Sequence, residues 1–268
     1  GKVQLLGERV GLFDGAKVDA SGGAGGGTVL VGGDYLGGQT PRADLKDLAK
    51  LESEPVKNAK ATVMADTAEI KADATVNGDG GKIILWSDEY TGFYGDLFAR
   101  GGVSGGNGGF VETSSKNNLQ AMGAGIASAA NGTGGLWLLD PSNLVISSLA
   151  SSGGSFNSGN PNVFTPDGTA NTAVVNNATI QNSLNAGTDV TLLTSGAAAG
   201  TGDITMTAGI SKDATVSGTA STLEMIAAGS INISQAIVTT DGGLSLVLGA
   251  QSGVTIGSNI ATLGGNLT

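Results

Sequence analysis

The sequence predicts an all-β fold, a right-handed parallel β-helix with about three short strands in each coil of about 21 to 28 residues. Glycine takes 47 of the 268 positions, and short apolar runs that alternate with small polar residues end repeatedly in Gly, Asn, Asp or Ser. These runs also recur at regular spacing, which is typical of a solenoid. With coils about 4.8 Å apart, about ten coils would make a rod roughly 50 Å long, and right-handed crossovers are the rule for parallel strands.

In the first half, a Gly-Gly pair followed by an apolar run marks the repeat. The pairs end at Gly27, Gly81, Gly109 and Gly135. The first step is about twice as long as the next two, which fits two periods of about 27 residues followed by single periods of about the same length. A second alternating segment precedes each pair, as in AKVDASG from Ala16. We therefore expect strands and turns to repeat together.

The last third repeats with a shorter period. Its equivalent positions are Leu223 and Leu244, Ile231 and Val254, and Ile237 and Ile260, about 21 to 23 residues apart. One period earlier, DVTLLTSG, DITMTAG and ISKDATVSG fit the same template with longer loops. Three strands in each period of about 22 residues are predicted.

Two segments interrupt the repeat and define the expected organisation. Residues 39–58 are rich in charge, and Leu45, Leu48 and Leu51 lie at helical spacing between two prolines, which predicts a short amphipathic helix that covers a sheet face. Residues 149–166 are predicted to form an irregular loop. Coils are expected over residues 1–148 and 167–268, with the chain ending in mid-repeat as an internal segment of a longer protein.

Composition excludes several classes of function. The chain has no cysteine and no histidine, which removes disulfides, Cys/His zinc sites and Ser-His-Asp catalysis. A net charge of −10 repels a phosphate backbone, so no nucleic acid is expected, and no apolar run is long enough for membrane insertion. With 40% apolar residues the chain is too hydrophobic for a disordered coil.

The glycine-rich loops do not have the form of a cofactor site. GGNGG at residues 105–109 lacks the lysine and the following helix of a phosphate-binding loop. NGDGG at residues 77–81 is isolated, whereas calcium-binding repeats occur in tandem. We therefore expect no cofactor and no metal.

Several motifs in the first 150 residues closely resemble secreted filamentous haemagglutinin-like exoproteins of Gram-negative bacteria. They are VGLFDGAKVDASG, the VGGDY turn, WSDEYTGFYG at residues 86–95, ARGGVSGGNGGFVE at residues 99–112 and LLDP at residues 138–141. The insertion at 39–58 is longer and more charged than in that family, and the N-terminal secretion domain with its NPNG-type motifs is not found.

The resemblance implies an internal shaft segment of a large adhesin, or of the stalk of a contact-dependent toxin, secreted or held at the cell surface. The implied partners are an outer-membrane two-partner transporter and a host-cell or bacterial surface glycan or receptor. A non-enzymatic role in length, rigidity and display is therefore expected. A self-assembling extracellular filament, with end-to-end association of exposed coils, is the alternative.

A β-helical carbohydrate-active enzyme is the second alternative, and it depends on one turn. The acids Asp88, Glu89 and Asp96 could supply the two carboxylates, about 5 to 10 Å apart, that glycoside cleavage requires. Aromatic side chains lie beside them and are the candidates for contact with a carbohydrate: Trp86, Tyr90, Phe93 and Tyr94. The same pattern also fits exposed acids and aromatic packing over a loop, and no catalytic residue is assigned.

Overall fold

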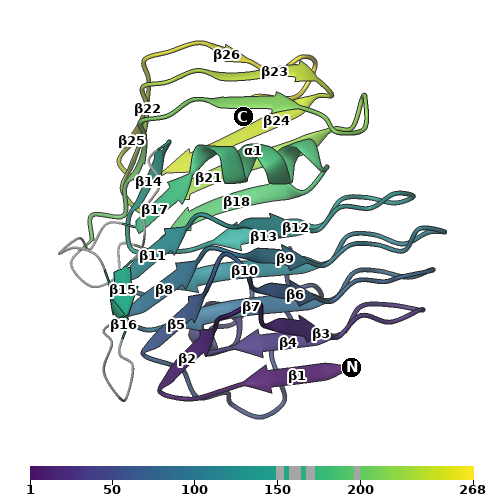
Figure 1. Ribbon diagram of the computed structural model, residues 1–268. Coiled ribbons are helices and arrows are strands. Elements are labelled where there is room, and N and C mark those ends of the chain that lie inside the picture. The colour runs from purple at the N-terminus through teal and green to yellow at the C-terminus, as the bar shows by residue number, and fades with distance from the viewer. Residues whose placement is uncertain (149–153, 157–163, 167–172, 196–199) are drawn as a thin grey trace.

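The computed structural model describes residues 1–148, 154–156, 164–166, 173–195 and 200–268 of the chain. Three sides of stacked, parallel strands form a β-solenoid, with the N-terminus at one end and the last strands at the other (Figure 1). This confirms the predicted fold class.

Each side of the solenoid is a sheet to which successive coils add one strand, with one exception in sheet B. Sheet A contains β1 (Lys2–Leu5), β4 (Thr28–Val31), β7 (Lys82–Ser87), β10 (Phe110–Ser115), β13 (Leu136–Leu139), β18 (Asp189–Thr194), β21 (Ser221–Ala227) and β24 (Leu244–Ala250). Sheet B contains, in spatial order, β2 (Arg9–Leu12), β5 (Ala61–Met64), β8 (Tyr90–Phe93), β11 (Asn118–Ala121), β17 (Ala173–Asn176), β14 (Leu144–Ser147), β19 (Ile204–Met206), β22 (Ser230–Ile233) and β25 (Gly253–Ile256). Sheet B is the exception because it holds two strands, β17 and β14, between β11 and β19, with β17 inserted out of chain order between β11 and β14.

The third side is divided into two sheets. Sheet C contains β3 (Lys17–Asp19), β6 (Glu69–Lys71), β9 (Asp96–Phe98) and β12 (Ala124–Ile126), and the later part contains β20 (Ile210–Asp213), β23 (Ile237–Asp241) and β26 (Ile260–Ala261). A small antiparallel pair, β15 (Gly154–Phe156) and β16 (Phe164–Pro166), lies outside the three sides. Most of the predicted irregular loop at 149–166 falls outside the described residues.

The Gly-Gly repeat sets the register of sheet A, with one correction. Thr28 pairs with Lys82, Lys82 with Phe110 and Phe110 with Leu136, so the residues that directly follow the four Gly-Gly pairs are aligned across the sheet as predicted. Because β4 pairs directly with β7, however, the long first step is one coil with an insertion and not two coils. Sheet A accordingly has eight strands, and the expected ten coils were too many because the insertions use up chain length.

The register of the last coils also corrects one prediction. Ile231 pairs with Val254 and Ile237 pairs with Ile260, as predicted. Leu223 pairs with Leu246 and not with Leu244. All three sides therefore advance by the same length of chain in this coil, as continuous stacking requires.

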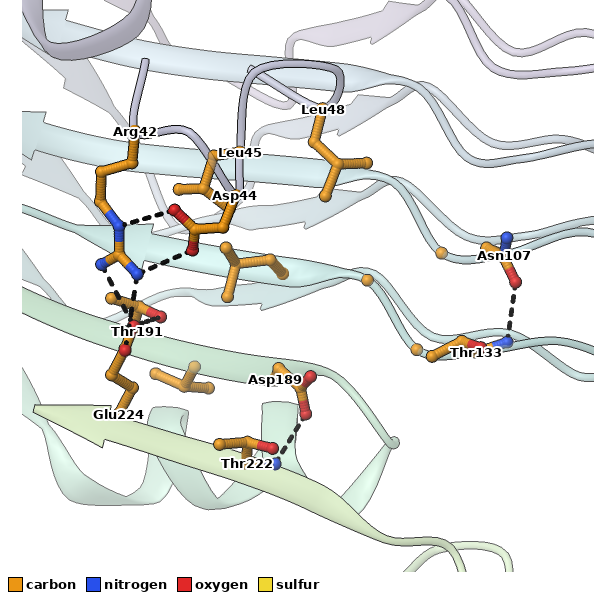
Figure 2. A pocket seen from close by; sticks show the side chains of 15 residues that line it. Arg42, Asp44, Leu45, Leu48, Asn107, Thr133, Asp189, Thr191, Thr222 and Glu224 are labelled. Carbon is orange, nitrogen blue, oxygen red and sulfur yellow. Dashed lines mark hydrogen bonds and ion pairs between the residues drawn. The ribbon is translucent and has the colours of Figure 1, made fainter. Parts of the chain in front are cut away.

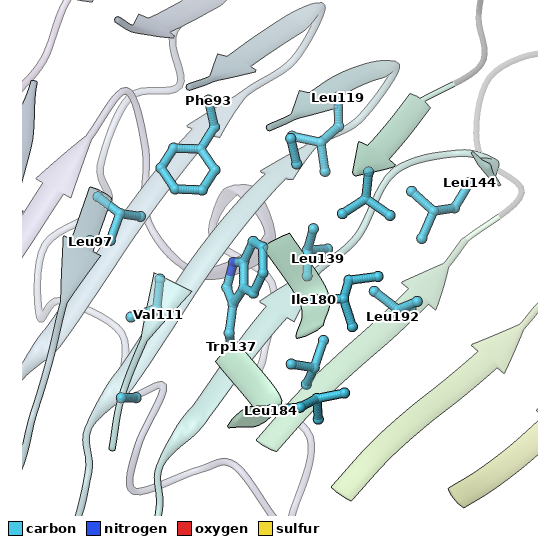
Figure 3. Close-up of a cluster of buried hydrophobic side chains, with 14 of the residues drawn as sticks. Phe93, Leu97, Val111, Leu119, Trp137, Leu139, Leu144, Ile180, Leu184 and Leu192 are labelled. Atoms are coloured by element: carbon cyan, nitrogen blue, oxygen red, sulfur yellow. The ribbon is translucent and has the colours of Figure 1, made fainter. Parts of the chain in front are cut away.

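The interior is a continuous column of apolar side chains contributed by alternate positions of the three sides. Its largest member is Trp137, which is fully buried, contacts Phe93 edge to face with ring centroids 6.1 Å apart, and donates from Nε1 to Thr113 Oγ1 at 3.0 Å (Figure 3). Gly125 makes room for it, because a Cβ there would lie 2.7 Å from the indole ring. The Trp137 indole therefore fits in the core only because position 125 has no side chain.

An α-helix replaces a strand on the third side. Helix α1 (Asn177–Asn185) begins after Asn176, whose side chain accepts a hydrogen bond from the amide of Ala178, and it packs between β12 and β20. Ile180 and Leu184, four residues apart on one helix face, enter the core beside Trp137 (Figure 3). Coils were expected here, so the helix is a difference from the prediction. Among the described residues no helix is both long and apolar enough to span a membrane.

Residues 38–59, here called the strap, connect sheet A to β5 within the second coil. The short helical element lies just before them, as the 3-10 helix η1 (Tyr35–Gly37), while the strap itself is a series of turns. Leu45 donates to the carbonyl of Arg42 at 2.9 Å and Ala49 to the carbonyl of Leu45 at 2.8 Å, so isolated helix-type hydrogen bonds, but no continuous helix, form where a helix was predicted. The helix prediction at 39–58 is therefore wrong in detail.

Candidate functional site

The strap covers the outer face of sheet A, as the leucine spacing predicted. Strands of this sheet are apolar on both faces, because Leu30, Ile84 and Phe110 point outward between the inward-facing core residues. Leu45 and Ala49 of the strap are buried against them. The solenoid therefore has a second, external apolar cluster in its first half, which the strap shields from water.

A buried ion pair holds the strap to the sheet. The ammonium of Lys82 lies 3.0 Å from Asp34 Oδ1, with only 9% and 3% of the two side chains exposed, and it also donates to the carbonyl of Lys50 at 2.6 Å. Asp34 in turn accepts the amides of Tyr35 and Glu52, each at 2.8 Å. These contacts join the strap and the turn before it to the strand that begins at Lys82.

A second buried carboxylate fixes the entry to the strap. Glu112 of β10 is fully buried and accepts the amide of Leu36 at 3.1 Å. Burial raises the pKa of Glu112 well above its ordinary value, an effect opposed by the hydrogen bonds from Leu36 and Ser114. Burying the carboxyl of Glu112 therefore costs desolvation free energy. In return, its hydrogen bond holds the backbone at Leu36 in position.

Between the strap and the later strands of sheet A lies a groove of about 410 Å³, which is the candidate site (Figure 2). Leu45 and Leu48 border it from the strap, and Leu136 and Val190 contribute from β13 and β18. Leu48 is 42% exposed. The groove thus offers an apolar surface to a ligand, bounded by polar side chains.

The polar border is acidic. Arg42 is bound to Asp44 at 2.8 Å and to Glu224 at 3.2 Å, which links the strap to β21 (Figure 2). Asp189 accepts the amide of Thr222 at 2.6 Å, and burial raises the pKa of its carboxyl. One basic and three acidic side chains line the groove, a formal charge of −2 when all are ionised.

Two of the four predicted carbohydrate contacts are covered by the protein itself. Phe93 is fully buried in the core. Trp86 is 4% exposed and lies beneath the chain that enters the strap, where a Cβ on Gly33 would come within 2.6 Å of the indole and one on Gly37 within 2.7 Å. Phe93 therefore has no ring face open to a sugar. Trp86 lines a hollow of about 220 Å³, but with only 4% of the residue exposed too little of its ring is free for stacking, so the expectation is wrong for these two residues.

The two tyrosines lie on the outer face of sheet B. Tyr90 and Tyr94 flank Gly92, where a Cβ would come within about 3 Å of both rings, and their hydroxyls are 2.9 Å apart. Tyr90 is buried and Tyr94 is half-buried. Contact between this pair and a carbohydrate stays a prediction.

The three predicted acids lie on different parts of the solenoid. Asp88 and Glu89 occupy the corner between sheets A and B, where Asp88 accepts hydrogen bonds from Trp86 Nε1 and Asn58 Nδ2. Asp96 begins β9 on sheet C and pairs in register with Glu69 of β6. The structure therefore brings Asp96 beside a different acid from those that the sequence suggested.

The groove residues on the later coils were not found from the sequence. The charge cluster at 39–58 pointed to the strap, but its contact with Glu224 spans 182 residues and has no local pattern. Among the described residues no group of three or more His, Cys, Asp or Glu could hold a metal ion.

No known family model matches the chain, and no curated protein matches it.

Proposed function

We propose that this chain is a non-enzymatic shaft segment of a large filamentous haemagglutinin-like adhesin, and that the strap and its groove form its recognition element. Stacked coils that share one continuous core give length and stiffness. The groove supports the adhesive part of the proposal, because it combines an exposed apolar surface with fixed polar groups. This observation carries the proposal.

The chemistry of the groove favours binding over bond cleavage. Glu224 accepts hydrogen bonds from both Arg42 and Thr191, so the donors of the protein itself already occupy its carboxylate oxygens. Leu48 is exposed next to these groups, where a partner would bury it. A ligand in the groove would therefore pack against the Leu48 side chain, next to the charged side chains of Arg42 and Glu224.

The proposal includes export of the parent protein through an outer-membrane transporter and display outside a Gram-negative cell. A chain with no cysteine can cross an oxidising compartment without forming disulfides that would lock it. Its sequence motifs, described above, are the basis for this part of the proposal.

A glycan array and a cell-binding assay test the adhesive role. The wild-type chain is compared with Leu48→Asp, which places a fourth acid in the groove, and with Val216→Asp as a matched control. Val216 is 70% exposed and lies in the turn between β20 and β21, outside the groove. Saturable binding by the wild type and by Val216→Asp, reduced at least about tenfold in Leu48→Asp, is expected.

Equal binding by all three proteins would place recognition elsewhere on the chain and would contradict the role of the groove. Absence of binding to every glycan and cell type would contradict the adhesive role and leave a spacer.

A carbohydrate-active enzyme remains the second candidate because of Glu69 and Asp96. They face each other on adjacent strands, and the pKa of Asp96 is raised, first by desolvation and then by the charge of Glu69. Lys71 binds Glu69 at 2.9 Å, so the two carboxyls have different surroundings, as an acid and base pair requires. Release of reducing ends from a polysaccharide, lost in Asp96→Asn, would support the enzyme and contradict the adhesin proposal.

A further inference from the structure

Asp140, directly after β13, has an unusual environment. Only 6% of the residue is exposed, and its Oδ1 is buried without a hydrogen-bond partner among the described residues. Burial raises the pKa of this carboxyl from 3.8 to about 7, with no opposing contribution from a cation. A buried carboxylate with no partner is costly and calls for an explanation.

Asp140 lies between two hollows on the outer side of sheet A. The smaller hollow, about 220 Å³, also has walls from Asn58, Asp88 and Lys116. The larger hollow, about 520 Å³, continues toward β21 and β24 with mainly apolar walls. The two share wall residues that include Leu36, Gln39 and Asp140. Small-ligand sites commonly measure about 300 to 1,000 Å³, which the larger hollow satisfies.

The unsatisfied groups beside the smaller hollow are hydrogen-bond acceptors. Asn58 donates from Nδ2 to the Gly37 carbonyl and to Asp88, which fixes its orientation and leaves a buried Oδ1 without a donor among the described residues. The Oδ1 of Asp140 lacks a donor too. A ligand that completed this site would have to bring donors, and an ammonium group carries three of them and a positive charge.

We propose that the two hollows beside Asp140 form a binding site for a small ligand with a primary ammonium group, such as a polyamine or an amino sugar. The ammonium would bind near Asp140, and the rest of the ligand would lie in the larger hollow against its apolar walls. This inference does not depend on the adhesive role of the groove, because the groove and these two hollows have no wall residue in common.

The other charged groups around Asp140 are consistent with a cation. Glu112 on β10 interacts with it as a like charge, and the amide of Asp140 donates to Ser114 Oγ on the same strand. Asp88 and Lys116 line the smaller hollow, and Lys116 is exposed to solvent. A ligand ammonium would supply the countercharge that the described residues do not bring to Asp140.

Calorimetric titration of the whole chain tests the proposal. The probes are 1,4-diaminobutane and glucosamine, with 1,4-butanediol and glucose as neutral counterparts. Saturable binding of at least one amine, at least about tenfold tighter than its neutral counterpart, is expected. Binding of only 1,4-diaminobutane would identify the ligand as a polyamine, and binding of only glucosamine would identify it as an amino sugar.

Two variants assign the binding to Asp140. Asp140→Asn keeps the shape of the side chain and removes its charge, and it should weaken amine binding at least about tenfold. Asp66→Asn changes an exposed acid in the turn after β5 and should leave binding unchanged. Binding of 1,4-diaminobutane, which keeps its ammonium groups charged over this range, should also be about tenfold tighter to the wild type near pH 8 than near pH 6, because Asp140 must lose its proton first.

Three results would overturn the proposal. They are equal binding of the neutral counterparts, undiminished amine binding by a folded Asp140→Asn protein, and no saturable binding of either amine at about 10 mM. The thermal midpoint of each variant verifies that it is folded. Because the groove variant Leu48→Asp is not part of this experiment, failure here leaves the adhesin proposal unaffected.

Discussion

Replacing Lys82 with methionine should detach the strap from sheet A. The substitution keeps most of the side-chain volume but leaves Asp34, only 3% exposed in its side chain, without its cation. Breaking a buried pair in this way costs about 3 to 5 kcal/mol. Asp34 would keep the amides of Tyr35 and Glu52, so the lower figure applies. At about 1.4 kcal/mol for each factor of ten, the opening equilibrium of the strap should rise about a hundredfold.

Amide hydrogen exchange measures this opening directly. The amide of Glu52, in the strap, bonds to Asp34, outside it, only while the strap is in place. The control is Lys71→Met, which removes a partly exposed pair with Glu69 and should cost no more than about 1 kcal/mol. An increase of less than about fivefold in Lys82→Met, equal to the control, would refute the view that this ion pair holds the strap.

Three further predictions concern the core, the coil spacing and pH. Trp137→Ala should lower the free energy of unfolding by about 3 to 5 kcal/mol in urea titrations, because a fully buried indole leaves a cavity; a loss below about 1 kcal/mol would contradict the packing described. Gly108→Ala should cost about 1 to 3 kcal/mol, because its Cβ would overlap the Ala127 carbonyl and the Gly135 amide of the next coil. Gly23→Ala, with open space around it, should be neutral or slightly stabilising by the same measurement. The raised pKa of Asp140, about 7 against 3.8, means that the folded chain keeps a proton that the unfolded chain loses, so stability falls as pH rises through this range. Asp140→Asn should therefore show a smaller loss of stability between pH 5 and pH 8, by about 2 to 3 kcal/mol, in urea midpoints.

The periodic parts of the fold could be predicted because stacking imposes periodicity on the sequence. A Gly-Gly pair precedes most sheet A strands of the first half, since neighbouring coils approach so closely that a Cβ on Gly81 or Gly109 would overlap the preceding coil's backbone. The need for glycine at these positions can therefore be seen directly in the sequence. The true step from Leu223 to Leu246 was missed because Leu244 and Leu246 both point inward, so the pattern fits either.

The insertions could be predicted only in part. Leucine spacing in the strap correctly indicated an apolar contact, but whether the chain forms a helix depends on polar contacts with Lys82 and Glu112, which lie far away in sequence. Helix α1 did have local signals, namely the cap at Asn176 and the spacing of Ile180 and Leu184. The prediction gave more weight to the strand patterns on either side of this segment than to these helix signals.

The candidate site was less predictable than the fold. Aromatic residues near Trp86 suggested a sugar platform, yet an aromatic side chain in a short sequence motif gives no indication of what covers it. Gly33 and Gly37 were the relevant signal, because they allow the backbone to lie on the indole. Asp140 belongs to the LLDP motif, but its burial follows from strands and a strap that are distant in sequence.

Binding to intact cells, measured as a full titration of the wild-type chain against Leu48→Asp and Val216→Asp, tests the central claim most directly. The adhesin proposal predicts a saturable curve for the wild type, the same curve for Val216→Asp, and at least about a tenfold weaker one for Leu48→Asp. Identical curves for all three proteins, or no binding by any of them, would contradict it.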